Sequence, residues 1–210
     1  ASLTPGGVHL RAEGSGNAVS SDLTVRLGTG VASIAGPGFL RDRTDRYLVW
    51  SDQAEFRFKV DDGGMTSLIE FAQARGGVEA VQGASRLSGS ELTASFAVSD
   101  SRSDIYKLSV LENARAVDGS GGELSSAELD VFFDAPEDAS APSPSTIDAR
   151  GGVLGQKDGA MLEAHSVRVV LEPDNQGRPS ATSLTATGAA RFVRAKGKDG
   201  GRGDLVEARS

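Results

Sequence analysis

The sequence predicts an all-β protein made of repeated antiparallel strand pairs. Three observations lead to this prediction: apolar and polar residues alternate along several segments, a marker recurs every 37 or 38 residues, and Gly-rich turns separate the segments. Alternation with a period of two places one set of side chains on each face of a sheet. Gly accounts for 27 of the 210 residues, about twice its usual share of roughly 7%, as expected for a chain with many turns.

The alternating segments are the expected strands. In the first of them Phe56 and Phe58 flank Arg57, so the two rings point to one face and the guanidinium to the other. One partial unit, residues 10–14 followed by 23–27, is expected before the series, and a short run closes it at 204–208. The main alternating runs are residues 54–60, 90–98, 127–133 and 165–171.

The recurring marker is a Gly or Asn at the end of a strand-like run, and it predicts one strand pair for each period. A second marker at the start of the second run keeps nearly the same period, with spacings of 36, 37 and 38 residues. The first marker falls at Gly38, Gly76, Asn113, Gly151 and Gly188, with spacings of 38, 37, 38 and 37 residues. The second marker falls at Glu55, Glu91, Glu128 and Ser166.

Turn residues separate the runs and supply the positive φ angles that hairpins require. The repeat stays in phase across the Pro-rich and acidic stretch 134–145, so we expect one long loop there and a single domain over 1–210. Residues 1–60 are its divergent units, with a charged stretch at 39–46, and 61–210 hold the clearest repeats. The expected turns lie at 61–64, 118–122, 158–159, 174–177 and 197–201.

The composition excludes several classes of function. There is no Cys and there are only two His residues, which argues against a thiolate nucleophile, a zinc site and a repeated His base. The net charge of −7 argues against nucleic acid as the main partner. No apolar run reaches the 18–20 residues, roughly, of a membrane helix. We expect no cofactor and no bound metal.

No arrangement of residues predicts an active site, so the protein is expected not to be an enzyme. The acidic residues Asp61, Asp62, Asp118 and Asp158 lie beside Gly and are interpreted as turn formers. His165 is expected to be a partly buried sheet residue. Two further interpretations are packing for Trp50 and Tyr47, and a solvated loop for the basic turn with Lys196, Lys198 and Arg202 and its Arg-Gly-Asp tripeptide.

A recurring pattern in the chain resembles that of a known family. It consists of a strand, Ala-x-Gly, a short strand, a turn and Leu-x-Ala-x-x-Val-x-Val. It is clearest at 147–153 with 162–169, and it recurs at 184–190 with 205–208 and at 125–131. It resembles the OstA-like domain of the LptA/LptC family of periplasmic lipopolysaccharide transport proteins. The resemblance covers about 65–208 well and 8–60 weakly.

The resemblance implies an open β-jelly roll, in which two antiparallel sheets enclose a hydrophobic groove that holds lipid acyl chains. It also implies a periplasmic, non-enzymatic protein of lipopolysaccharide transport. The implied partners are lipopolysaccharide or a related lipid, and other OstA-like proteins joined through edge strands. A head-to-tail homo-oligomer belongs to the same expectation. The expected groove residues are Phe56, Phe58, Ile69, Phe71, Leu92, Phe96, Leu108, Val110, Leu129, Val131, Phe133, Val167, Val169 and Leu184.

Two other functions and one other structure remain open from the residues alone. The alternation fits a closed sandwich core at least as well as a groove. The repeat with its Gly-rich turns also fits a structural or adhesive β-repeat surface protein. A carbohydrate-binding jelly roll is the third reading, although only 5% of the residues are aromatic and there is one Trp.

Overall fold

A computed structural model describes residues 29–41, 46–99, 102–134, 142–175 and 179–194 in full, and the strands nearest the two termini by their backbone. The strands of the first half are β1 (Ser2–Thr4), β2 (Gly7–Ala12), β3 (Gly16–Arg26), β4 (Val31–Arg41), β5 (Arg46–Trp50), β6 (Gln53–Asp61), β7 (Gly64–Gln82) and β8 (Ser85–Val98). Those of the second half are β9 (Ser103–Val117), β10 (Glu123–Asp134), β11 (Ser143–Lys157), β12 (Ala160–Pro173), β13 (Pro179–Thr187), β14 (Ala190–Arg194) and β15 (Leu205–Ala208).

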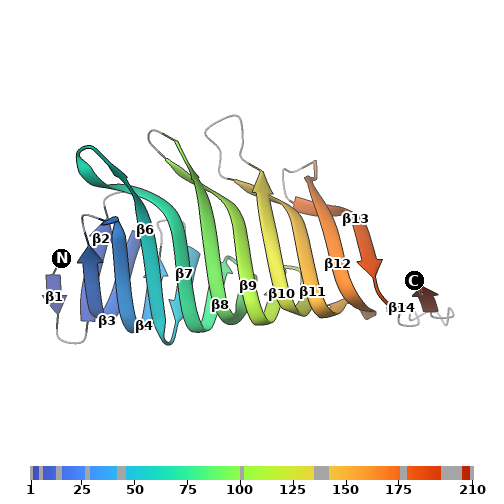
Figure 1. The fold of residues 1–210 in the computed structure, drawn as a ribbon. Coiled ribbons are helices and arrows are strands. Elements are labelled where there is room, and N and C mark those ends of the chain that lie inside the picture. The colour runs from blue at the N-terminus through green and yellow to red at the C-terminus, as the bar shows by residue number, and fades with distance from the viewer. Residues whose placement is uncertain are drawn as a thin grey trace.

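All described strands belong to one antiparallel sheet, and each pairs with the strands nearest to it along the chain. The order is β1-β2-β3-β4-β5-β7-β8-β9-β10-β11-β12-β14-β15, with β6 beside β4 and β7 and with β13 beside β12. Figure 1 shows the strands in this order, with the hairpin ends of the long strands along the upper edge. The prediction of an all-β chain is confirmed, and the described residues contain no α-helix.

A line of β-bulges crosses the sheet and bends each long strand. The pairing register shifts between Arg75 and Val78 and again between Arg150 and Val153. Bulges bend a strand locally and increase its twist. The residues on this first bulge line include Gly76 and Gly151, both with φ above +80°, a conformation that favours Gly.

The bend folds the sheet back on itself into a short limb and a long limb. The short limb holds about four or five residues of each strand, such as 85–88 and 153–157, and the long limb holds about eight, such as 91–98. Trp50 and Phe56 show the fold-back directly. Six residues of extended chain span about 20 Å, yet these two rings pack edge to face with their centroids 6.5 Å apart.

The core lies between the limbs and closest to the bend. Ala74, Leu92, Val110 and Leu129 form one inward row across the long limb, in register from strand to strand, and all are buried. The next row away from the bend, which includes Val131, is slightly more exposed. The short limb has two inward rows of its own, one with Val78 and Ala114 and one with Ala80, Leu87 and Leu124, and these side chains belong to the same core or pack against it.

A second bulge line crosses the long limb beyond these two rows. The register shifts between Arg57 and Phe58, Ser95 and Phe96, Phe132 and Phe133, and Val170 and Leu171. Each repeat of the chain therefore contains both bends as well as the turns. The second bulge line separates the covered part of the long limb from its hairpin tips.

The sequence markers lie at the first bulge line rather than at the ends of strands, which corrects the prediction. Gly76, Asn113 and Gly151 lie inside β7, β9 and β11, because a bulge lets a strand continue through a positive φ. In the first unit Gly36, not Gly38, has the positive φ. The division into two sheets, the jelly-roll topology and the groove between sheets are not confirmed.

Candidate functional site

The fourteen residues predicted to line a groove fall into four groups in the structure. Two inward rows near the bend hold Leu92, Val110, Leu129 and Val167, and then Phe56, Leu108, Val131, Val169 and Leu184. Beyond the second bulge line lie Phe58, Ile69, Phe96 and Phe133. Phe71 is separate from all of these.

Six of the fourteen side chains are buried among the protein's own residues. They are Phe56, Leu92, Val110, Leu129, Val131 and Val167, and the last belongs to a smaller second core cluster. The short limb covers them, so they belong to the core between the limbs. Their main contribution is to the free energy of folding, at about 1.5–3 kcal/mol for each fully buried side chain.

Beyond this core lies a half-buried row, which we call the distal row: Phe58, Ile69, Phe96, Ile105, Phe133 and Leu171. Its phenylalanines pack against the core on one side. Phe58 pairs with Ile69, and Phe96 with Ile105, so the paired side chains share a face. The distal row is the third inward row of the long limb, and the short limb presents only two.

Phe71 lies on the opposite, outer face of the sheet, so its assignment to the groove is wrong. Its neighbours Ala72 and Ala74 point into the core, and Phe71 is one residue out of phase with them. The guanidinium of Arg57 lies 5.1 Å from the centroid of the Phe71 ring. The bulge between Arg57 and Phe58 changes the side that later residues face, and the sequence pattern did not show this bulge.

Leu184 lies at the C-terminal end of the long limb. It pairs with Val169 and continues the second inward row, but it is 56% exposed. Among the described strands, its strand β13 pairs with β12 alone. The inward apolar surface thus reaches the edge of the described long limb there.

The outer face of the long limb carries two acidic side chains that are almost fully buried, Asp130 and Asp148. Asp130 accepts hydrogen bonds from Ser109 Oγ at 2.5 Å and Arg150 Nη2 at 2.7 Å, and its Oδ2 lies 3.2 Å from Lys107 Nζ. Asp148 accepts two bonds of 2.6 Å from Arg168. These contacts tie β9, β10, β11 and β12 together across the strands.

The same contacts lower the pKa of both carboxyl groups. For Asp130, burial raises the pKa, but the bonds from Ser109, Arg150 and Lys107 outweigh it and the net shift is downward. For Asp148, the bond from Arg168 lowers the pKa more than burial raises it. A depressed folded-state pKa adds stability above the unfolded-state value of about 4, and this stability is lost as the pH falls through the folded-state pKa.

We therefore expect Asp148→Asn to lower the free energy of unfolding at pH 7 and to weaken its fall with acid below about pH 4. Urea unfolding at pH 7, 4 and 3 measures both effects. Asp62→Asn, at an exposed hairpin tip, removes the same charge and serves as the control. Equal pH profiles for Asp148→Asn and the unchanged protein would contradict the assignment.

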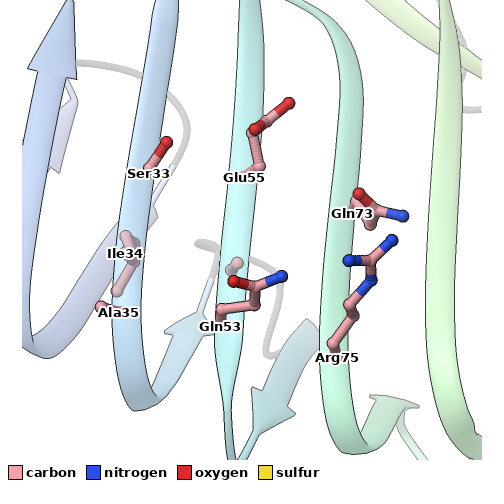
Figure 2. A pocket seen from close by; sticks show the side chains of 8 residues that line it. Ser33, Ile34, Ala35, Gln53, Glu55, Gln73 and Arg75 are labelled. Atoms are coloured by element: carbon pink, nitrogen blue, oxygen red, sulfur yellow. The ribbon is translucent and has the colours of Figure 1, made fainter.

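A shallow polar hollow lies on the outer face over β4, β6 and β7. Figure 2 shows Gln53 and Glu55 from β6 beside Gln73 and Arg75 from β7, next to the small side chain of Ser33 on β4. The hollow measures about 170 Å³. Two of its side chains are already bound: Glu91 accepts from Gln73 Nε2 at 2.5 Å and from Arg75 Nε at 3.0 Å.

Other residues singled out in the sequence have structural positions. Trp50 is 1% exposed and donates from Nε1 to Gly36 O at 3.1 Å, so its assignment to packing is confirmed. Asp118 lies in a turn, where its Oδ1 accepts from the backbone of Ser120 and Gly122. His165 is exposed at the bend instead of partly buried. The basic turn with Lys196, Lys198 and Arg202 lies outside the described residues.

The sequence analysis missed part of the distal row and all of the carboxylate contacts. The signal for the distal row was present: Phe58, Phe96, Phe133 and Leu171 are spaced by 38, 37 and 38 residues, the same period as the markers. Nothing in the sequence marked Asp130 and Asp148, because their importance depends on cross-strand register.

Comparison with known proteins gives no relative: no family model, no curated protein and no solved structure matches the chain. Within the described residues, no group of three or more His, Asp and Glu side chains is placed to hold a metal ion. The described part also contains no helix with the length and apolar character needed to cross a bilayer. The fold and the site therefore define the protein at present as a repetitive, bent antiparallel sheet with an apolar distal row.

Proposed function

We propose that this protein is a non-enzymatic lipid-binding protein that holds acyl chains against the distal row. The observation that carries the proposal is the difference between the limbs. The long limb has three inward rows and the short limb has two, so the distal row has no opposing row. Apolar side chains left beyond the reach of the short limb provide a surface for apolar ligands. The resemblance to OstA-like proteins supports lipopolysaccharide or a related lipid as the ligand, and the periplasm as the compartment.

The distal row suits a chain-like ligand because it is continuous across strand pairs. Phe58, Phe96, Phe133 and Leu171 recur once in each repeat, and neighbouring strands of a sheet lie about 4.8 Å apart. Equivalent side chains are therefore about 10 Å apart along the sheet. Each acyl methylene removed from water on this surface contributes about 0.8 kcal/mol, so a chain that spans two repeats gains several kcal/mol.

Assembly through strand edges belongs to the same proposal. β13 is a nine-residue strand that pairs with β12 alone among the described strands, and it contains no charged residue. Natural edge strands are usually short or charged, because a free edge recruits other strands. An edge of this kind suits head-to-tail pairing with a second copy or with another OstA-like protein.

The distal row predicts that Phe133, but not its neighbour Phe132, is needed for binding. Phe133→Glu and Phe96→Glu are expected to weaken the binding of a fluorescent fatty-acyl probe at least about tenfold, because each places a charge on the apolar surface. Phe132→Glu is the matched control: Phe132 lies on the outer face, with Lys107 Nζ 5.3 Å from its ring centroid. Saturable probe binding and displacement by lipopolysaccharide provide the measurement, and circular dichroism checks folding.

A third variant separates the distal row from the core. Val131→Glu places a charge in the covered row and is expected to unfold the protein rather than to remove a binding surface alone. If the unchanged protein binds no acyl probe, or if Phe132→Glu and Phe133→Glu weaken binding equally, the proposal is wrong. A structural β-repeat protein would then explain the fold better.

A further inference from the structure

The side of the short limb that points away from the long limb, which we call the back face, carries exposed apolar side chains. Val49 is one of them, because its neighbours Leu48 and Trp50 belong to the core or pack against it and successive side chains of a strand point to opposite sides. The described residues include eight exposed large apolar side chains. Four of the eight lie on the back face by the same alternation, and they are 39–50% exposed: Phe39, Val49, Leu154 and Met161.

The outer face of the long limb is different, since none of the eight lies on it between the two bulge lines. Its phenylalanines Phe71 and Phe132 are covered by cations, with Arg57 at 5.1 Å and Lys107 at 5.3 Å from the ring centroids. The other four exposed side chains lie near the hairpin tips or on inward surfaces at the C-terminal end of the sheet: Val60, Tyr106, Leu184 and Phe192. Grouped apolar side chains on one face mark a surface that another surface covers.

The four apolar side chains form two pairs at opposite ends of the back face. Eight neighbouring strands of the sheet follow one another there in the order β4-β5-β7-β8-β9-β10-β11-β12. Phe39 and Val49 lie opposite each other on the first two strands, and Leu154 and Met161 lie on the last two. The two pairs are therefore equally far from the middle of the face, which falls between β8 and β9.

Two exposed ion pairs lie between the apolar pairs. Arg86 Nη1 is 3.3 Å from Glu79 Oε1, and Arg115 donates to Glu123 from Nε at 2.6 Å and from Nη2 at 2.8 Å. The four charges sum to zero, although the chain as a whole carries −7. The middle of the back face therefore does not repel a second copy of the chain.

We infer that the back face binds a second copy of this chain. The two copies form a closed dimer whose two-fold axis runs parallel to the strands, over the gap between β8 and β9. The axis places Val49 of one copy over Leu154 of the second copy, because the pairing register puts both residues in one row across the sheet. The apolar pair at each end of one copy then covers the pair at the other end of the second copy.

The same axis makes the charged middle of the face complementary to itself. Arg115 of the second copy comes to lie beside Glu79, and Glu123 of the second copy beside Arg86, each displaced by one strand, or about 4.8 Å. Like charges are farther apart, by two residues along a strand, or about 7 Å. Exposed ion pairs add little affinity, but charges of this arrangement fix the register of the two copies.

The back face is large enough for a reversible dimer. Eight strands at about 4.8 Å span about 38 Å, and four residues of each strand span about 14 Å. The two copies would bury on the order of 1,100 Å² in total, near the lower end of the range for specific interfaces. The contact uses neither the distal row nor the edge of β13, so it goes beyond the proposed function and does not depend on it.

Sedimentation equilibrium of the full chain tests the inference, across about a hundredfold range of concentration around the micromolar region. We expect a monomer–dimer equilibrium, and Val49→Glu and Leu154→Glu should each raise its Kd at least about tenfold by placing a charge in an apolar contact. Val60→Glu is the matched control, because Val60 is 44% exposed but lies at a hairpin tip, and it should leave the Kd unchanged. Circular dichroism checks folding.

Charge swaps test the two-fold arrangement. Glu79→Arg with Arg86→Glu keeps the net charge and the ion pair within one copy, but it brings like charges together between copies and should weaken the dimer. Adding Arg115→Glu and Glu123→Arg reverses the second ion pair as well and should restore the dimer. If the first swap has no effect, or the second brings no recovery, the inferred arrangement is wrong.

The remaining outcomes separate the dimer from lipid binding. A chain that stays monomeric over the whole range would overturn the inference. A dimer that neither Val49→Glu nor Leu154→Glu weakens would overturn it as well, since the copies would then join elsewhere, as at the edge of β13. Binding of the acyl probe to the same variants is expected to be unchanged, so a failure of the dimer and a failure of the proposed function are seen in different measurements.

Discussion

Trp50→Ala is expected to lower the free energy of unfolding by about 3–5 kcal/mol, the usual cost of removing a large buried aromatic side chain. Trp50 joins the two limbs. Its ring packs edge to face against Phe56, and its Nε1 donates to Gly36 O at the bend. Removing it leaves a cavity where the short limb meets the long limb, together with one unsatisfied carbonyl.

Urea unfolding followed by circular dichroism measures this loss, because Trp50 is the single Trp of the chain and the variant has no Trp fluorescence. Trp50→Phe keeps an aromatic ring and loses the donor, so it should cost less. Val49→Ala is the control on the same strand, since Val49 is exposed, and should change stability by under about 1 kcal/mol. A loss of that small size for Trp50→Ala would show that the limbs do not depend on this contact.

Gly151→Ala is expected to be strongly destabilising, although it adds a single methyl group at the first bulge line. Gly151 has a φ of +83°, and a Cβ there would lie 2.6 Å from the Cβ of Ala127. The left-handed conformation costs an L-residue about 1–2 kcal/mol, and a forced contact in a packed region costs about 1–3 kcal/mol more. The expected loss in free energy of unfolding is therefore about 3 kcal/mol.

The neighbouring Gly152 provides a control with the same backbone conformation. Its φ is +82°, but a Cβ there meets nothing within 4 Å, so Gly152→Ala should cost only the conformational part. Adding Ala127→Gly to Gly151→Ala removes the colliding methyl group and should recover the steric part, which a double-mutant cycle isolates. Equal losses for the two glycines, or no recovery in the double variant, would contradict this account of the bend.

The strands were predictable because alternation and repetition are local properties of the chain. Residues 54–60 and 127–133 were predicted as strands and lie within β6 and β10. The bend was not predicted. Its markers were recognised, but the sequence alone does not distinguish a Gly inside a strand from a Gly at the end of a strand. Only the pairing partners distinguish the two positions.

Most residues of the candidate site were predictable from the sequence, but the line between the covered core and the distal row was not. Alternation identified the inward residues, Phe96 and Leu92 among them, without showing that the first lies beyond the short limb and the second beneath it. That distinction depends on the lengths of the two limbs, and hence on where each strand bends. Phe71 was misplaced for a related reason, since one extra residue at a bulge reverses every later side chain.

The sequential pairing of the sheet makes its length depend on the number of repeats. Each repeat of 37 or 38 residues contributes one strand pair, and so advances the sheet by about 10 Å, while contacts are made almost wholly between adjacent strands. In such arrays stability accumulates unit by unit, and folding can spread from any nucleus to its neighbours. Duplication or loss of a whole unit would therefore change the reach of the protein in fixed steps while leaving the cross-section, and every interaction within it, the same.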